Sequence, residues 1–163
     1  MCGVLGVIET VLFPELADAT WRLACDGDAA GRQLYARHYS ARQYRDNRER
    51  KLFVGPGEKL VLVTHDYRAL FVWRRFVDDS GQQGINCAAF RNEGGQLSSA
   101  LIRSADAIAW QKWPGERLYT YVDPGAIRST NPGYCFLAAG WRRCGWTKGG
   151  HGRRRLRILE ILP

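Results

Sequence analysis

The segment YVDPGAIRSTNPGYCFLAAGW, residues 121–141, places side chains suited to acid–base chemistry between an apolar strand-like stretch and a helix rich in small residues. Asp123 could orient or deprotonate a nucleophile, and Tyr134 could donate a proton to a leaving group, with Asn131 close by. The competing interpretation is that Asp123 caps a Pro-Gly turn and that Tyr134 is half-buried packing. Cys135 could act as a nucleophile only if its thiolate were stabilised, and no histidine is near it in sequence, so a packed residue is favoured.

A second segment, FRNEGGQLSSALI over residues 90–102, has the pattern of a strand, a glycine pair and a helix start. Unpaired backbone N–H groups at a helix start bind anions, and glycines let the backbone approach a phosphate closely or take a positive φ. A capped strand-to-helix turn without a ligand fits the pattern equally well. The candidate anion site comprises Arg91, Asn92, Gly94, Gly95, Gln96, Ser98 and Ser99.

A third cluster, His38, Tyr39 and Ser40, contains a histidine next to a tyrosine. Such a pair could take part in acid–base work or in substrate stacking. A helix-end histidine beside a packed tyrosine is the alternative, and the residue types alone favour it.

Basic and aromatic residues indicate a polyanionic partner. The chain has 24 Lys plus Arg against 16 Asp plus Glu, a net charge of +8, and arginine makes planar bidentate contacts with phosphate. Six tryptophans and seven tyrosines add side chains that could stack on bases. A basic but inert surface, or a charged strand edge that blocks pairing, is the alternative. The candidate nucleic-acid contacts are Arg142, Arg143, Lys148 and Arg153.

The rest of the composition narrows the class of protein. The five cysteines are odd in number and lack CxxC spacing, and the three histidines form no HxxxH pair, so neither a disulfide framework nor a metal site is favoured. No apolar run approaches the roughly 18 residues of a membrane span, and the start lacks a basic leader. We therefore expect a reduced, intracellular chain with no membrane partner.

The hydrophobic pattern predicts the scaffold for these residues, a mixed α/β fold in one domain over residues 1–163. The strand-helix-strand units after residue 85 predict right-handed parallel crossovers. Strands are expected at 4–12, 59–65, 69–76, 85–92, 117–123 and 153–162, and helices at 15–25, 32–44, from Ser98 or Ser99 to about 113, and at 134–145.

Two of these segments together resemble known families. FRNEGGQLSS is similar to the acyl-CoA pyrophosphate loop of the GNAT acetyltransferase superfamily, Q/R-x-x-G-x-G/A. Arg91 and Gly94 match its first two fixed positions, and Gln96 departs from the third, which leaves the donor open. The order RHYS, FRNE…SSALIRSA and TYVDP…NPGYCFLAAGW, over residues 32–150, resembles the Mom-type phage DNA-modification proteins.

The resemblance implies a GNAT-like mixed sheet flanked by helices, with splayed central parallel strands. It implies transfer of an acyl or related group from acetyl-CoA or a related acyl-CoA to a base amine of double-stranded DNA. In that family this protects phage DNA from restriction in the cytoplasm of the infected bacterial host. It also implies that Asp123, Tyr134, His38 and Tyr39 are functional, that Asn131 faces the acceptor amine, and that Arg91 and Ser99 belong to the donor loop; a homodimer is left open.

Two other functions stay open. One is a general GNAT N-acetyltransferase acting on a small amine or a protein, against which the net charge of +8 argues mildly. The other is a non-catalytic DNA-binding module on a GNAT-like scaffold, because a fold does not determine a function. The acceptor base is open too: Mom-type proteins place a carbamoylmethyl group on adenine, and an amine on a hypermodified pyrimidine is the alternative.

Overall fold

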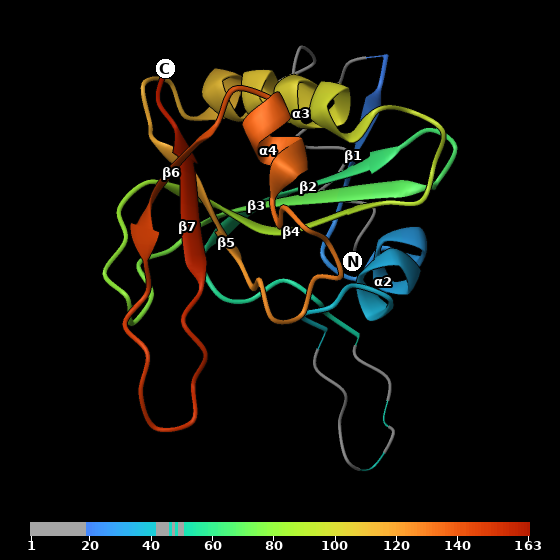
Figure 1. Ribbon diagram of the computed structural model, residues 1–163. Helices are drawn as coiled ribbons and strands as arrows, with labels where there is room; N and C mark the ends of the chain where they lie inside the picture. Colours follow the sequence, from blue (N-terminus) through green and yellow to red (C-terminus); the bar gives the residue numbers. More distant parts are fainter. Residues whose placement is uncertain (1–18, 42–45, 47, 49–50) are drawn as a thin grey trace.

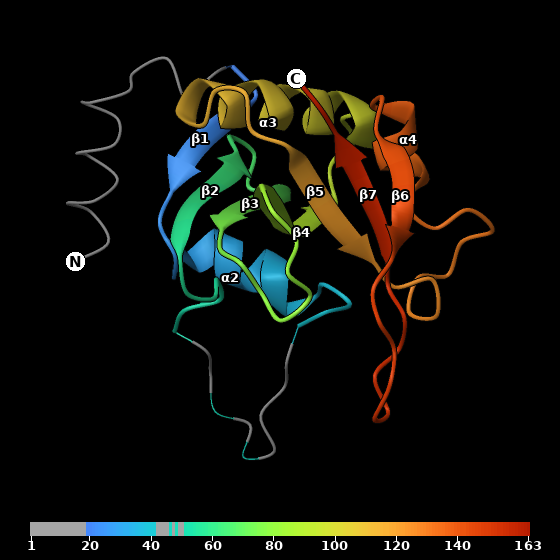
Figure 2. The same ribbon diagram turned by 90° about the vertical axis from the view of Figure 1, so that its left-hand side faces the viewer.

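The computed structural model describes residues 19–41, 46, 48 and 51–163, which form a seven-stranded open mixed sheet flanked by helices (Figure 1). The α/β class is therefore confirmed. Helices α3 (Ser98–Lys112) and α4 (Tyr134–Ala138) cover one face, and α2 (Ala29–Ala36) covers the other (Figure 2). The strands are β1 (Trp21–Ala24), β2 (Glu58–Thr64), β3 (Ala69–Arg75), β4 (Ile85–Asn92), β5 (Leu118–Val122), β6 (Arg142–Trp146) and β7 (Arg157–Ile161).

The strand order across the sheet is β1-β2-β3-β4-β5-β7-β6. Every neighbouring pair is antiparallel except β4 and β5, which are parallel and are joined through α3. The predicted parallel crossover after residue 85 is confirmed for this unit. The second predicted unit, residues 117–123, 134–145 and 153–162, is wrong as a parallel crossover, because its last strand, β7, pairs antiparallel with β5, and the strand that directly follows α4 is β6.

Alternating side chains of the central strands build two cores, one on each face of the sheet. In β2, Leu60 and Leu62 pack on the α3 side, whereas Val61 and Val63 pack on the α2 side. This period of two is the reason that the β2–β3 hairpin could be predicted from sequence. Helix α3 completes the larger core with Leu101, Ile102, Ala105, Ile108 and Ala109.

Three tryptophan side chains from the sheet side of the core form hydrogen bonds with α3. Trp21 and Trp73 each donate an indole N–H to a backbone carbonyl of α3, at 3.3 and 3.1 Å. Trp141, just before β6, donates to the Asp106 carboxylate of α3 at 2.9 Å. Each of these rings therefore adds a hydrogen bond to the apolar area that it buries.

The predicted helix at residues 15–25 is wrong for the part that is described. Trp21–Ala24 is strand β1, which pairs antiparallel with β2. So short an apolar stretch has no decisive periodicity, and pairing beside β2 satisfies its backbone groups. The strand predicted at 4–12 lies outside the described residues.

Two predicted helices have different bounds in the structure. Helix α2 begins at Ala29, capped by the Asp28 carboxylate on a backbone N–H at 2.9 Å, and ends at Ala36 instead of reaching residue 44. The predicted helix at 134–145 ends at Ala138, because Gly140 takes a left-handed φ of 103°. The chain then forms β6, a strand that the sequence pattern did not predict. Within the described part of the chain, no helix is both long and apolar enough to cross a membrane.

Candidate active site

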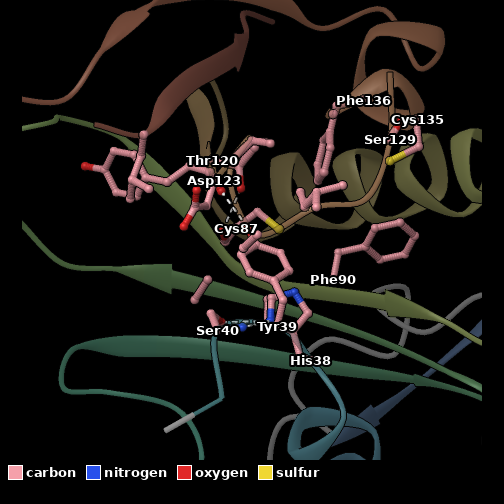
Figure 3. Close-up of a pocket in the computed structure, with 18 of the residues that line it drawn as sticks. His38, Tyr39, Ser40, Cys87, Phe90, Thr120, Asp123, Ser129, Cys135 and Phe136 are labelled. Atoms are coloured by element: carbon pink, nitrogen blue, oxygen red, sulfur yellow. Dashed lines mark hydrogen bonds between the residues drawn. The ribbon is translucent and has the colours of Figure 1, made fainter. Parts of the chain in front are cut away.

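The site lies where β4 and β5 separate. Their parallel pairing covers only Ile85–Cys87 opposite Leu118–Thr120. At the last pair the Thr120 hydroxyl donates to the Cys87 carbonyl at 3.0 Å and closes the base of the gap. Beyond this point a cavity of about 670 Å³ opens between β4, β5, the loop after α2 and the start of α4 (Figure 3). Its lining includes the five side chains predicted for chemistry: His38, Tyr39, Asp123, Asn131 and Tyr134.

A β-bulge in β4 shapes one wall of the cavity. Cys87 pairs with Trp73 and Ala89 pairs with Val72, so Ala88 is the extra residue. The side-chain alternation shifts with it, because Cys87 belongs to the core on the α3 side and Ala89 to the core on the α2 side. The ladder with β5 has ended here, so backbone groups turned toward β5 have no partner on that strand. They can meet a ligand in the cavity.

His38 follows α2 and is half-buried in the cavity wall. The Ser40 hydroxyl lies 2.7 Å from Nδ1, and the Ser40 N–H donates to the same nitrogen at 3.2 Å. Nδ1 accepts the Ser40 N–H, so the neutral ring carries its proton on Nε2. Burial, together with the charge of Arg91, lowers the pKa of His38 to about 4. The imidazole is neutral at pH 7, so it is unsuited to act as a general acid there.

Tyr39 crosses from this loop to the end of β5. Its phenol donates to the Tyr121 carbonyl at 3.4 Å, and its ring centroid lies 4.5 Å from that of His38. Burial raises the pKa of Tyr39, so the phenol stays protonated at neutral pH. The residue is still 44% exposed, and Figure 3 shows the ring within the cavity. Tyr39 thus joins the two walls and offers an aromatic face to a ligand.

Asp123 directly follows β5 and has two sets of contacts. One carboxylate oxygen accepts the Gly125 N–H at 2.8 Å, which is the turn contact expected for Asp-Pro-Gly. The other oxygen lies 3.5 Å from the Arg154 guanidinium, and the side chain is only 18% exposed. The turn contact and a role in the cavity are therefore compatible, because they use different oxygens.

The loop before α4 brings Asn131 and Tyr134 to the same cavity. Gly133 takes a φ of 82°, and a Cβ there would meet the Leu159 side chain at 2.8 Å, so glycine is required at this approach of loop to sheet. Tyr134 is the first residue of α4 and is 63% exposed. The Asn131 carbonyl oxygen of the side chain accepts from Arg143 at 2.6 Å, which fixes its orientation.

The predicted anion site at the β4–α3 turn does not line the cavity, whose wall on β4 ends at Phe90. Gly94 and Gly95 have no positive φ, contrary to expectation. A Cβ at Gly95 would meet nothing within 4 Å, and one at Gly94 would lie 3.3 Å from the Arg68 side chain. Backbone conformation therefore does not require glycine at this turn.

Asn92 organises the turn from within. Its amide nitrogen donates to the Gln96 carbonyl at 2.8 Å and to the Ser98 hydroxyl at 3.0 Å, and its oxygen accepts a backbone N–H of the turn at 2.9 Å. The predicted cap by Ser98 or Ser99 is wrong, because the N-cap is Leu97 and Ser99 is buried in α3. No side chain caps this helix start, so its first N–H groups stay available to an anion.

Arg91 is engaged in an ion-pair cluster. Its Nε donates to Glu93 at 2.6 Å and its Nη1 to the Arg37 carbonyl at 2.5 Å, while Arg37 donates to both oxygens of Glu93 at 2.7 and 2.8 Å. The hydrogen bonds from Arg37 and Arg91 lower the pKa of Glu93 to about 2. The cluster ties the loop that carries His38 to β4. A donor phosphate at Arg91 would have to compete with Glu93.

Three of the four cysteines in the described part of the chain are free thiols. Cys87, Cys135 and Cys144 are free, whereas Cys25 is disulfide-bonded, so the expectation of a chain without disulfides is wrong at that residue. Burial raises the pKa of Cys135, which disfavours the thiolate and supports a packed residue. Among the described residues, no group of three or more His, Cys, Asp or Glu side chains is placed to hold a metal ion.

The four predicted nucleic-acid contacts fall into two pairs. Arg142 pairs with Glu160 at 2.8 Å and Arg143 donates to Asn131, so both guanidinium groups are engaged on the sheet. Lys148 and Arg153 are exposed on the β6–β7 loop, where no carboxylate of the described chain pairs with them.

The cavity also uses residues that sequence reasoning did not single out. Nothing in the sequence distinguishes Thr120 from other threonines in strands. Its importance depends on its position at the last β4–β5 pair, which only the assembled sheet reveals. Arg154 lines the cavity, but nothing in the run of three arginines marks the middle one. The bulge at Ala88 likewise has no glycine to signal it.

Comparison of the chain with models of known protein families, with curated proteins and with solved structures gives no match in any of the three. The geometry of the cavity is therefore the basis for a functional proposal.

Proposed function

We propose that this chain is an enzyme that transfers an acyl or related group from a CoA-like donor to an amine of a DNA base. The observation that carries the proposal is the cavity between the separating ends of β4 and β5. It gathers two residues of the α2 loop, His38 and Tyr39, with Asp123, Asn131 and Tyr134 from beyond β5. A group-transfer site needs such convergence of polar side chains on an otherwise apolar cavity.

The sheet supports a GNAT-like scaffold for this reaction. The order β1-β2-β3-β4-β5-β7-β6, with one parallel pair that separates after Thr120, resembles the splayed sheet of that superfamily. The donor's chemistry would be that of an activated carbonyl on sulfur. The uncapped start of α3 offers backbone N–H groups to its phosphates, whereas Arg91 is held by Glu93.

In this reaction the amine nitrogen bonds to the carbonyl carbon, the carbon–sulfur bond breaks, and a proton moves from nitrogen to sulfur. Among the described residues that line the cavity, Asp123 is the only carboxylate, so it is the group placed to accept the amine's proton. Tyr134, with its exposed phenol at the start of α4, is placed to donate a proton to the leaving sulfur.

The bulge in β4 supports the charge that develops on the carbonyl oxygen. The β4–β5 pairing ends at Cys87 and Thr120, so a backbone N–H group of β4 that faces β5 beyond this pair would lie on the cavity wall. Fixed donors of this kind stabilise an oxyanion without reorganising during the reaction. His38, which is neutral, packs against the Tyr39 ring instead of moving a proton.

The aromatic lining and the positive charge support a nucleobase as the acceptor. Tyr39, Phe90, Tyr134 and Phe136 all line the cavity, and a planar base displaced from its stack is commonly held by such side chains. The net charge of +8 favours approach to a polyanion.

The test is mass spectrometry of nucleosides from duplex DNA incubated with the protein and acetyl-CoA, and from DNA co-expressed with it. We expect a base of increased mass with the wild type. Asp123→Asn and Tyr134→Phe should each reduce its yield by roughly 10²–10⁴-fold, the usual effect of losing an acid or base. Asp79→Asn and Tyr67→Phe, at exposed positions outside the cavity, are matched controls that should keep full yield.

Unmodified nucleosides from the wild type under both conditions would refute the transfer to DNA. Wild-type yield from both Asp123→Asn and Tyr134→Phe would refute their roles. A melting-temperature rise with acetyl-CoA, as expected for a ligand that binds only the folded state, tests the donor separately. Transfer of a labelled acetyl group to a small amine or a protein, but not to DNA, would instead establish the general acetyltransferase.

A further inference from the structure

The β6–β7 connection, Thr147–Leu156, extends the sheet into an arm. Figures 1 and 2 both show this segment projecting beyond the ends of the strands, on the side away from α3. Two contacts at its base keep it paired: the Thr147 N–H donates to the Leu156 carbonyl, and the Leu156 N–H donates to the Thr147 hydroxyl, both at 2.9 Å. The arm is thus a continuation of the hairpin.

The tip of the arm is a tight two-residue turn. Gly150 and Arg153 form an antiparallel bridge, and His151 and Gly152 between them have positive φ values of 49° and 76°. Two successive positive φ values are typical of the type I′ turn that closes twisted hairpins. Cβ atoms at Gly150 or Gly152 would meet nothing within 4 Å. The end of the arm is therefore a regular hairpin turn with no side chains at its two glycines.

The arm carries only positive charge. Lys148, Arg153, Arg154 and Arg155 lie within it, with no acidic residue from Thr147 to Leu156, and every residue from Lys148 to Arg155 is exposed. A surface cation cluster without acidic neighbours is uncommon on a strand that merely needs solvation, where both signs of charge serve equally well.

The arginines of the arm point in different directions because strand side chains alternate. Arg154 turns back to the cavity, where its guanidinium lies 3.5 Å from Asp123. Arg155 turns toward Trp146, with its guanidinium carbon 5.7 Å from the ring centroid, and Arg157 lies closer over the same ring at 3.8 Å. The arm therefore borders the cavity through Arg154 and Leu156, and Arg155 lies on its other side, toward Trp146.

We propose that this arm is a two-stranded ribbon that enters the major groove of duplex DNA beside the base to be modified. Lys148 and Arg153 contact backbone phosphates there, and the contact of the arm with the cavity, through Arg154 and Leu156, sets the cavity next to the strand. The inference rests on the proposed function for the duplex as acceptor. The major groove is about 12 Å wide and admits a two-stranded ribbon, and the glycine tip adds no width of its own.

The side chains favour duplex over single-stranded DNA. Proteins that bind single strands supply open aromatic faces on which bases stack. Trp146, at the base of the arm, is 39% exposed and has the Arg157 guanidinium 3.8 Å from its ring centroid, and the arm itself has no aromatic ring apart from the His151 imidazole. Cations on a narrow ribbon suit a groove between two phosphate backbones.

The test compares binding of a labelled 20-base-pair duplex by wild type and by Lys148→Gln/Arg153→Gln, using fluorescence anisotropy from 50 to 200 mM salt. Each lost phosphate contact should reduce the salt slope of log K by about 0.9, so the double variant should lose about 1.8. The same relation predicts roughly 200-fold weaker binding at 50 mM salt and roughly 20-fold at 200 mM. Arg75→Gln/Arg103→Gln removes equal charge elsewhere and should bind far more like the wild type.

A second variant separates insertion from general attraction. Replacing 148–155 by Asn-Gly leaves Thr147 and Leu156 as the closing pair of a two-residue turn, so the sheet is retained. The wild type should protect guanine N7, a major-groove atom, from dimethyl sulfate, and this variant should not. Equal salt slopes for the arm variant and its control, tighter binding of single strands, or no N7 protection would each overturn the inference.

The two proposals fail separately. If the wild type binds duplex DNA through the arm but yields no modified nucleoside, the proposed role of the arm is supported and the proposed group transfer is refuted. If modification occurs but the arm variants bind and modify DNA as the wild type does, the proposed role of the arm is refuted and the proposed group transfer is supported.

Discussion

Replacing Asp106 by asparagine should stabilise the protein near pH 8 and have a much smaller effect in acid. Asp106 lies on α3 and is 2% exposed. One carboxylate oxygen accepts the Trp141 indole N–H at 2.9 Å, and the other has no hydrogen-bond partner in the described structure. Burial raises its pKa from 3.8 to about 7, against the smaller opposing effects of Trp141 and Arg103. An asparagine keeps the acceptor for Trp141 and cannot ionise.

The sign follows from the direction of the shift. Because the folded protein holds this proton more tightly than the unfolded chain, its contribution to stability is complete below pH 3.8 and is lost as the pH rises through about 7. A difference of about three pKa units corresponds to about 4 kcal/mol of unfolding free energy once the carboxylate is ionised in both states. For a chain of this length that is a melting-temperature difference of roughly 10 °C.

The assay is urea or thermal unfolding of wild type and Asp106→Asn between pH 4 and 8. The difference in unfolding free energy should grow with pH in favour of the variant. The asparagine NH₂ group would find no hydrogen-bond acceptor at the position of the second carboxylate oxygen. This lowers the unfolding free energy of the variant by the same amount at every pH, so the pH dependence of the difference is unchanged. Asp79→Asn, at an exposed position, removes the same formal charge and serves as the control.

Parallel stability curves for wild type and Asp106→Asn over this pH range would contradict the reasoning. They would mean that Asp106 ionises in the folded state as easily as in the unfolded chain. In that case water or a cation must reach its free oxygen, and α3 must pack less closely on Trp141 than the structure has it.

Two further changes test the walls of the cavity. Gly133→Ala should lower stability by at least the 1–2 kcal/mol of a left-handed residue, or roughly 3–8 °C, because its Cβ also meets Leu159, whereas Gly95→Ala should change the melting temperature little. Thr120→Val should cost about 1–3 kcal/mol in urea unfolding, since it leaves the buried Cys87 carbonyl without the hydroxyl at the last β4–β5 pair; an unchanged midpoint would show that this bond does not hold the strands.

Local patterns were enough to predict much of the sheet. β2, β3, β4 and β5 each show apolar alternation or a dense β-branched run, and the structure places all four within about two residues of the predicted bounds. β1 and β6 were missed because their formation depends on partners. Trp21–Ala24 pairs with β2, and Arg142–Trp146, whose residues are mostly exposed, pairs only with β7. A strand that forms mainly because a neighbouring strand pairs with it need not show a hydrophobic periodicity in its own sequence.

The site divides in the same way. Asp123, Asn131 and Tyr134 lie within one short segment, so their proximity could be predicted from sequence. His38 and Tyr39 reach the same cavity because of the path that the chain takes after α2. In the sequence, only the family resemblance placed these two residues with Asp123 and Tyr134. Glu93 directly follows β4 and pairs with Arg91 near the end of that strand, and this ion pair weakens the case for Arg91 as a phosphate ligand.

The cavity exists because two irregularities occur at neighbouring points of the sheet. The β4 strand has its bulge at Ala88, and the β4–β5 ladder ends at Thr120, so beyond this point β4 and β5 no longer pair and the cavity lies between them. The loop carrying Tyr39 spans the opening, and the arm at Arg154 borders it. In the function proposed above, this gap would hold the acyl group against a nucleophile borne by a polyanion, with Asp123 and Arg154 in its lining.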